Sequence, residues 1–449
     1  MRYGEYKILE MLWNKRIPQH WQTVPLCSIA TEKSICNCNE LPLLSVYLDN
    51  GVVPFEKMGT KRTNATSKDV SKYQRVDPGD FVLNNQQAWR GSVGVSDYTG
   101  IVSPAYVILS MDDTLNRRYA NYLMRSSFMI DQFYIVSKGV GSIQRNIYWP
   151  EFKRSIVPVP PREEQEQIVR YLDWKVSKIN KLIHGYQRQI KLLEERKRAQ
   201  ITYMVTHDRF CDERVESEIY WLKDIPVNWH VTRLKHILQK QDRPVLPNAE
   251  LLICSNSGDV KPRGDNKLGL VADNDDIYQG VAKGDLLIHG MDTWHGAIAI
   301  SNYDGMCTPV VHVCTSNQSL RFICYYLRMM AFTKVFKAIS NGVRQNTSDF
   351  RSWDKAGSLL IALPPFREQE AISDILDAEI AKIDIGIATL KRQIGIMEEY
   401  RTRLISDVVT GQMDVRGIEV PDYIPEEDID ETVEENKDAE VDTDAESDQ

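Results

Sequence analysis

The sequence predicts an α+β protein in which two similar α/β domains alternate with two long helices, and three observations predict it. The chain matches itself at a spacing of about 205 residues. Each copy holds short β-type runs between Gly, Asn and Asp turns, and each ends in a long segment of helical periodicity. We therefore expect a pseudo-two-fold internal duplication, with the two helices forming an antiparallel two-helix coiled coil that separates the domains.

The repeat sets the expected boundaries along the 449 residues. The first domain covers 1–158, the first helix 159–207, the second domain 208–362, the second helix 363–412, and an acidic, disordered tail 413–449. Domains of about 145 residues are large enough to bury a core of their own.

Each domain opens on the same element, W-x3-I-P-x2-W, which occupies Trp13–Trp21 and Trp221–Trp229. We expect Trp21 and Trp229 to anchor the start of each domain. Two strands are expected in each copy, at short apolar runs, and each copy also holds one helical stretch. The runs are Phe81–Leu83, Tyr106–Leu109, Gly284–Ile288 and Val310–Val313, and the helical stretches are Asn116–Tyr134 and Ser319–Ile339.

A Pro-Pro pair precedes each long helix, and from Pro160 and Pro364 onward the two copies align without a gap at an offset of 204. Proline fixes where a helix starts, and Thr410-Gly411 marks the end of the second one. Apolar residues then recur at spacings of four and three, as in a coiled-coil seam. The alternative is that each stripe packs on its own domain. The seam residues are Ile168, Leu172, Val176, Ile179, Ile183, Ile190 and Leu193, and Ile372, Leu376, Ile380, Ile383, Ile387, Leu390, Ile394 and Met397.

The net charge of -8 comes from the C-terminal end of the chain. Residues 419–449 carry 15 acidic residues and one basic residue, so the rest has 54 basic and 48 acidic residues, a net of +6. This mildly basic body is compatible with a DNA partner, and the tail is expected to be disordered from Pro425.

The order of these repeated blocks resembles the specificity subunits of type I restriction-modification systems over residues 13–415. The family opens each unit with I-P-x-x-W, and its PP-x2-EQ-x2-I element stands here at Pro160–Ile168 and Pro364–Ile372. The resemblance implies that each domain reads one half of a bipartite, interrupted double-stranded DNA target and that the coiled coil sets the gap. It also implies two adenine methyltransferase (modification) subunits and two translocase-nuclease (restriction) subunits as partners.

Polar, basic stretches are the candidates for DNA contact, because Lys and Arg suit phosphates whereas Arg, Asn, Gln and Ser suit base edges. A solvated face and a shared structural turn are the alternatives. In the first domain the candidates are Lys57, Lys61, Arg62, Lys68 and Lys72, and a loop with Ser142, Gln144, Arg145 and Asn146. In the second they are Ser255, Asn256, Lys261, Arg263, Asn266 and Lys267, with Arg344, Gln345 and Asn346 as the counterpart of the loop.

Other functions find less support in the sequence. Trp89 and Trp294 occupy equivalent positions and are expected in the core rather than as base-stacking platforms. His289 and His295 have no counterpart in the first copy, so no metal site is expected. Leu363–Phe366 resembles the [DNS]PP[YF] element of amino-methyltransferases but lacks its polar first residue. A scaffold that joins two non-DNA-binding domains would also explain the helices and the duplication.

We accordingly expect no catalytic residue and no cofactor in this chain. No G-x4-GK[ST] phosphate loop occurs, no apolar run is long enough for a membrane span or a signal peptide, and the eight cysteines form no disulfide or zinc pattern. The simplest location is the reducing cytoplasm.

Overall fold

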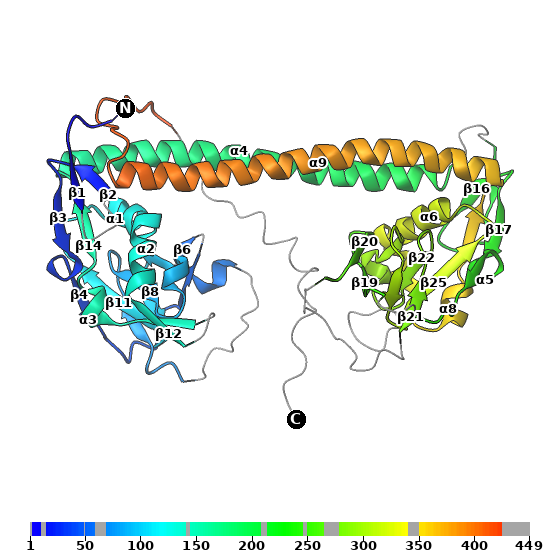
Figure 1. Ribbon diagram of the computed structural model, residues 1–449, viewed down its shortest axis with the longest axis horizontal. Helices are drawn as coiled ribbons and strands as arrows, with labels where there is room; N and C mark the ends of the chain where they lie inside the picture. The colour runs from blue at the N-terminus through cyan, green and yellow to red at the C-terminus, as the bar shows by residue number, and fades with distance from the viewer. Residues whose placement is uncertain are drawn as a thin grey trace. The chain divides into compact units, whose positions relative to one another are not determined.

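Two helices of more than forty residues are the longest elements of the computed structural model, and their prediction is confirmed (Figure 1). Helix α4 runs over Arg162–Met204 and α9 over Phe366–Val409. Each begins one residue after its Pro-Pro pair, and the carbonyl oxygens of Pro161 and Pro365 accept the first backbone hydrogen bonds. Gly411, at a φ of +70°, ends the second helix in the left-handed conformation that favours glycine.

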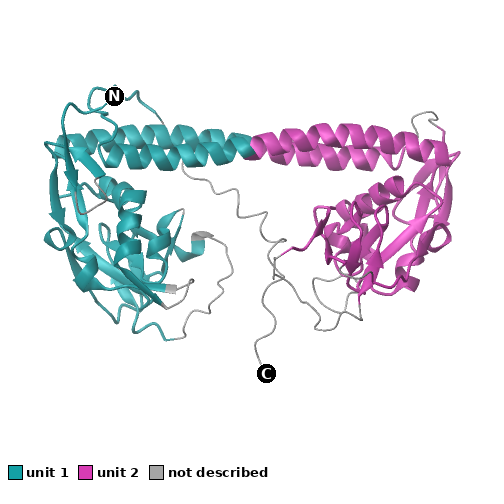
Figure 2. Cartoon of the chain, viewed as in Figure 1, with its two compact units in different colours: residues 1–186, 392–439 teal, residues 187–391, 440–449 magenta. Residues whose placement is uncertain are grey.

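The structure describes residues 2–9, 15–48, 50–58, 69–140, 144–207, 213–245, 249–264, 278–339 and 350–423. These form two compact units (Figure 2), one built from 1–186 and 392–439 and the other from 187–391. Each unit therefore contains a β-rich domain with parts of both long helices. Within the described residues, no helix has both the length and the apolar character that crossing a membrane requires.

The first unit centres on an antiparallel sheet of order β4-β11-β8-β9. Its strands are β4 (Ala30–Lys33), β11 (Tyr106–Met111), β8 (Phe81–Asn84) and β9 (Val93–Val95). Two-stranded pairs surround it: β1–β2 (Tyr6–Leu9, Lys15–Pro18), β3–β14 (Gln22–Pro25, Ile156–Val159), β5–β6 (Leu44–Tyr47, Gly51–Pro54), β7–β10 (Gln74–Val76, Gly100–Val102) and β12–β13 (Ser137–Val140, Gln144–Ile147). Its short helices are α1 (Arg117–Met124), α2 (Ser127–Val136) and α3 (Trp149–Phe152).

The second unit has the antiparallel order β18-β25-β22-β23. Its strands are β18 (Leu238–Lys240), β25 (Val311–Ser316), β22 (Leu286–His289) and β23 (Ile298–Ile300). The pairs are β15–β16 (Arg214–Glu216, Asp224–Pro226), β17–β26 (His230–Arg233, Leu360–Leu363), β19–β20 (Leu252–Cys254, Val260–Pro262) and β21–β24 (Gln279–Val281, Gly305–Cys307). Its short helices are α5 (Leu234–Ile237), α6 (Leu320–Phe332), α7 (Val335–Ile339) and α8 (Trp353–Gly357).

The four predicted strand runs lie in β8, β11, β22 and β25, but each predicted helical stretch is two helices rather than one. In the first unit the break follows Met124, where Ser126 Oγ donates to the Leu123 carbonyl oxygen at 2.6 Å. In the second it falls at Thr333 and Lys334, and Lys334 has a φ of +60°. Hydroxyl-to-backbone bonds and a left-handed residue each end a helix locally, which apolar periodicity does not reveal.

The segment after α9 packs on the first unit, although the tail was expected from residue 413. Val415 is fully buried, and Ile418 and Val420 lie against the same core. Gln167 Nε2 on α4 donates to the carbonyl oxygens of Val415, at 3.1 Å, and Ile418, at 2.7 Å. The beginning of the expected tail is thus part of the first unit, while residues 424–449 lie outside the described part.

We expect truncation after Tyr423 to leave both thermal stability and the recognised DNA sequence unchanged. Truncation after Gly417 also removes Ile418 and Val420, so it should lower the free energy of unfolding by about 1–3 kcal/mol without changing that sequence. Calorimetry and mapping of methylated adenines measure the two effects. A changed methylation motif in the chain truncated after Tyr423 would mean that the acidic tail takes part in recognition.

Candidate nucleic-acid interface

Each domain is fastened to the first turn of a long helix by a tryptophan and a glutamate. Trp21 Nε1 donates to Glu164 Oε1 at 3.1 Å, and Trp229 Nε1 donates to Glu368 Oε1 at 2.9 Å. Both indoles are buried, with 1% and 4% of their surface exposed. The last Trp of W-x3-I-P-x2-W and the Glu of the PP-x2-EQ element therefore form one contact in each unit.

The glutamine that follows each glutamate forms a hydrogen bond with the start of the domain helix. Gln165 Oε1 accepts the backbone N–H of Asn116, directly before α1, at 2.6 Å. Gln369 Oε1 accepts that of Ser319, directly before α6, at 3.0 Å. Their amide nitrogens donate to Pro160 and Pro364, at 2.9 and 2.8 Å. Both side chains are buried, so these motif residues hold the domain on its helix rather than facing a ligand.

About two turns further along each long helix, a buried or half-buried aspartate makes a similar connection to the domain. Tyr122 Oη donates to Asp173 at 2.9 Å, and Arg118 Nη1 lies 3.0 Å from the same carboxylate. In the second unit Tyr325 Oη donates to Asp377 at 2.6 Å, and Arg321 pairs with it at 2.8 Å. Burial raises the pKa of Asp173 above its ordinary value, against the opposing effects of Arg118 and the Tyr122 hydroxyl.

An arginine supports a hairpin in each unit: Arg125 directly follows α1, and Arg328 lies within α6. Arg125 Nη2 donates to the Leu48 carbonyl oxygen, beside β5–β6, and Arg328 Nη2 donates to that of Ser257, beside β19–β20, both at 2.8 Å. Gly258, at a φ of +80°, leaves room for Arg328, because a Cβ there would collide with the guanidinium. The sequence reasoning missed this contact, although Y-x-x-R occurs in both copies at 122–125 and 325–328.

The candidate loop with Arg145 is a hairpin instead, since Gln144 to Asn146 belong to β13 and pair with β12. Arg145 Nε and Nη2 donate to Ser137 Oγ and to its carbonyl oxygen, at 3.0 and 3.2 Å. Its guanidinium carbon lies 4.2 Å from the ring centroid of Tyr134. Arg145 is thus oriented by its own domain, and Asn146 beside it is half-buried.

The candidates of the second domain gather on the β19–β20 hairpin. Ser255 Oγ lies 2.7 Å from Ser257 Oγ, Asn256 and Lys261 are exposed, and Lys261 Nζ is 4.0 Å from Asp259. Arg263 follows β20 and is half-buried. These side chains lie on or directly after one polar hairpin, and their contact with DNA stays a prediction.

The structure describes only some of the remaining candidate residues for DNA contact. Lys72 is exposed, and Lys57 and Gln144 have a described backbone only. Nine lie outside the described residues: Lys61, Arg62, Lys68, Ser142, Asn266, Lys267, Arg344, Gln345 and Asn346. The proposed equivalence of Gln144–Asn146 with Arg344–Asn346 therefore stays a prediction.

Trp89 and Trp294 are half-buried rather than in the core. Trp89 Nε1 donates to the Gln86 carbonyl oxygen at 3.0 Å, and the Arg90 guanidinium carbon lies 4.6 Å from the indole centroid. Lys337 Nζ lies 5.7 Å from the Trp294 ring. Each indole therefore has a cation over it. His289, considered above for metal, pairs with Asp292 at 3.1 Å.

The seam residues of the long helices are all buried or half-buried. Ile168, Leu172, Ile179 and Ile183 belong to the core of the first unit, where Ile394 and Met397 of α9 pack against it. Ile372, Leu376 and Ile380 belong to the core of the second unit. In each unit, residues of the stripe therefore contribute to the core of the domain, and residues of both long helices share that core; the coiled-coil seam along the full length of the helices stays a prediction.

Comparison with known proteins identifies a family and relatives that this chain resembles. Residues 18–192 match the family described as type I restriction modification DNA specificity domain. A putative type I restriction enzyme MjaX specificity subunit from Methanocaldococcus jannaschii is 25% identical over 379 residues, covering 78% of this chain and 81% of the relative. The MjaVIII specificity subunit of the same organism is 26% identical over 275 residues, 57% of each chain.

A solved structure shares the fold. It was described in work on the structural basis of complex assembly and conformational transition of the type I R-M system. Its TM-score is 0.64 at 13% sequence identity, and the alignment covers 89% of this chain and all of that one.

Proposed function

Because this chain belongs to the specificity subunits of type I restriction-modification systems, we propose that it selects the DNA sequence on which such a complex acts. Each β-rich domain reads one half of a bipartite, interrupted target. The chain supplies no catalytic residue and no cofactor of its own, and it works on double-stranded DNA in the cytoplasm.

One observation carries this proposal: the two units repeat the same attachments between domain and long helix. Tryptophan to glutamate, glutamine to the start of the domain helix, and tyrosine and arginine to aspartate recur at equivalent positions. The sheets β4-β11-β8-β9 and β18-β25-β22-β23 also have the same pattern. Such repetition supports an internal duplication, with residues 1–158 and 208–362 as two target-recognition domains.

The long helices, with the residues that adjoin them, occupy 159–207 and 363–412. They are proposed to form an antiparallel coiled coil that sets the gap between half-sites. In the first unit Arg401 Nη1 donates to Asn180 Oδ1 at 2.7 Å, and in the second Lys197 Nζ pairs with Asp384 at 2.7 Å. Seventeen residues separate Asn180 from Lys197, and seventeen separate Asp384 from Arg401. One antiparallel register accommodates both contacts.

The same helices are proposed to dock two modification subunits, and with them two restriction subunits. Large apolar side chains stay exposed along them: Leu192 at 58%, Ile385 at 68% and Ile396 at 50%. Each is off the seam, so packing between the helices does not require it. In the proposed complex, these are side chains that a partner subunit would cover.

The salt dependence of DNA binding tests this function against the scaffold alternative. A protein that contacts several phosphates loses about 10³–10⁵ in affinity between about 50 and 200 mM salt. We expect a loss of this size for the chain assembled with its modification partner. Absent or salt-insensitive binding would favour a scaffold that joins two non-DNA-binding domains.

Replacing Arg145 with alanine tests whether the β12–β13 hairpin reads DNA. The variant is expected to weaken only the half-site of the first domain, because a lost base or phosphate contact costs about 1–3 kcal/mol. Mapping of methylated adenines and binding to half-site variants measure the effect. Ser137→Ala, which removes the hydroxyl that orients Arg145 at 3.0 Å but keeps the cation, should have a smaller effect in the same direction. Equal loss at both half-sites would mean that the hairpin acts through the fold.

A further inference from the structure

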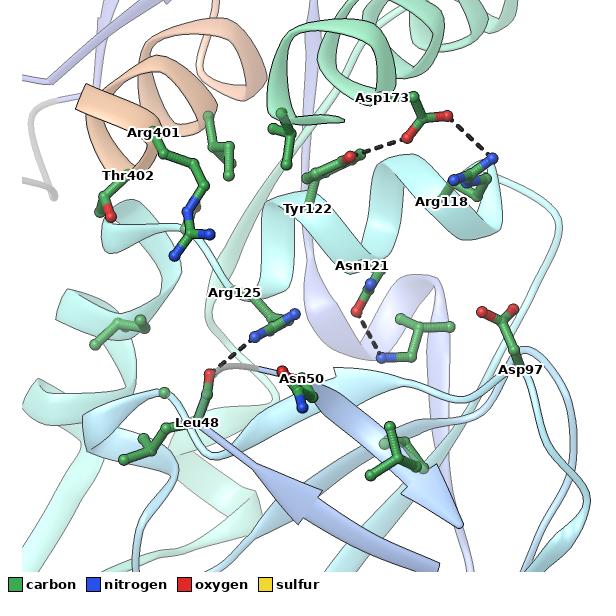
Figure 3. A pocket seen from close by; sticks show the side chains of 18 of the residues that line it. Leu48, Asn50, Asp97, Arg118, Asn121, Tyr122, Arg125, Asp173, Arg401 and Thr402 are labelled. Atoms are coloured by element: carbon green, nitrogen blue, oxygen red, sulfur yellow. Dashed lines mark hydrogen bonds and ion pairs between the residues drawn. The ribbon is translucent and has the colours of Figure 1, made fainter. Parts of the chain in front are cut away.

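A large polar cavity lies in the first unit, where the β5–β6 hairpin, α1, α4 and α9 meet (Figure 3). Its volume is about 970 Å³. Five arginines and two aspartates line it, so arginines outnumber aspartates in the lining. These residues are Arg90, Arg117, Arg118, Arg125 and Arg401, with Asp97 and Asp173.

The aspartates stay close to two of the arginines and leave the α9 side of the cavity cationic. Arg117 lies 3.6 Å from Asp97, and Arg118 lies 3.0 Å from Asp173. Arg401 extends from α9 into the cavity on the side of Arg125 (Figure 3), and its hydrogen bond goes to the neutral amide of Asn180. Because this partner is neutral, the contact supplies no negative charge to compensate that of Arg401.

The second unit provides an internal comparison, because the helices align at an offset of 204. Arg401 corresponds to Lys197, and Asn180 corresponds to Asp384, so the same contact in the second unit is an ion pair of 2.7 Å. Arg118 corresponds by sequence to Arg321, which pairs with three carboxylates, Glu370, Asp374 and Asp377, at 2.7–2.8 Å. The second unit therefore places more carboxylates on these cations than the first unit does, where Arg118 pairs with Asp173 and Arg401 with an amide.

We propose that this cavity binds a phosphate group, and that the phosphate belongs to the backbone of the DNA. Guanidinium groups bind phosphate oxygens through paired N–H donors, and phosphate contacts orient a protein on the duplex without reading its sequence. Asn50 and Asn121 add amides to the lining. The inference rests on the proposed function for the source of the phosphate, whereas a free phosphate shares the same chemistry.

Two pairs of matched variants of the full chain test the site. Asn180→Asp places a carboxylate beside Arg401, as Asp384 stands beside Lys197, and Gln393→Glu adds the same charge at an exposed position of α9 outside the cavity. Arg401→Gln removes the cavity cation, and Lys197→Gln removes its counterpart in the second unit. Thermal unfolding verifies that all four fold.

Anisotropy of a labelled duplex, titrated at several salt concentrations, gives the first readout. Asn180→Asp and Arg401→Gln should each raise the Kd about tenfold and reduce the slope of log K against log salt by about one, as the loss of one phosphate contact does. Gln393→Glu and Lys197→Gln should stay within about twofold of the unchanged chain.

Calorimetric titration with inorganic phosphate distinguishes a free phosphate from a phosphate of the DNA backbone as the ligand. Phosphate binding that Asn180→Asp abolishes, with unchanged DNA slopes, assigns the cavity to a free phosphate and overturns the backbone assignment. If both cavity variants match the unchanged chain in both titrations, the cavity is no phosphate site and the inference fails. Failure of the unchanged chain itself to bind DNA would instead reject the proposed function.

Discussion

Replacing Trp21 with alanine is expected to lower the free energy of unfolding of the first unit by about 3–5 kcal/mol, the usual cost of truncating a buried tryptophan. Its ring is 1% exposed and lies 5.9 Å from that of Tyr3. The substitution also removes the N–H that Glu164 accepts at 3.1 Å, which leaves a carboxylate only 5% exposed with fewer donors. Chemical denaturation with a probe in the first unit measures the loss.

Trp89→Ala is the matched control, because it deletes an indole of the same size that is only half-buried. Its cost should stay below about 2 kcal/mol. Glu164→Gln isolates the charge: it keeps an oxygen that Trp21 Nε1 can reach, so its cost should be smaller than that of Trp21→Ala. Equal stabilities of the Trp21 and Trp89 variants would refute the anchoring role of the W-x3-I-P-x2-W element.

The long helices were predictable because several signals coincide in them. A Pro-Pro pair stands before each start, a glycine follows the end of the second, and an apolar stripe runs through each. The strands were found where apolar runs are short and flanked by turns, as at Phe81–Leu83. The two helix breaks were missed because a serine hydroxyl at 126 and one left-handed residue at 334 carry no periodic signal.

The motifs were easier to find than to interpret. The repeated Trp and Glu were recognised as two separate blocks, and only the fold brings Trp21 to Glu164, 143 residues away. Composition selected residues that lie on the β19–β20 hairpin, whose contact with DNA stays a prediction, and it did not select the arginine-lined cavity. Its lining comes from distant segments at 48–53, 90–98, 117–130, 173–180 and 401–405, so no local pattern exists. Charges that meet only in three dimensions escape a reading along the chain.

Deleting one heptad from each long helix is expected to shorten the gap in the recognised DNA sequence by about three base pairs. Seven residues at about 1.5 Å each remove roughly 10 Å of helix, and B-DNA rises about 3.4 Å per base pair. Residues 187–193 and 388–394 are suitable, because the register of Asn180 with Arg401 and of Lys197 with Asp384 places them opposite each other. Removing whole heptads also keeps the apolar stripe continuous.

Duplicating the heptads instead of deleting them distinguishes an effect of helix length from an effect of damage to the fold. Duplicating the same heptads should lengthen the gap by about three base pairs. Both variants should keep the two half-site sequences, because the hydrogen bonds that attach each domain to its long helix lie outside the altered segments. Deleting the heptad from α4 alone breaks the register and should lower stability without giving a new defined gap. Mapping of methylated adenines gives each result directly. A gap that stays constant through deletion and duplication would show that the helices do not measure the distance between half-sites.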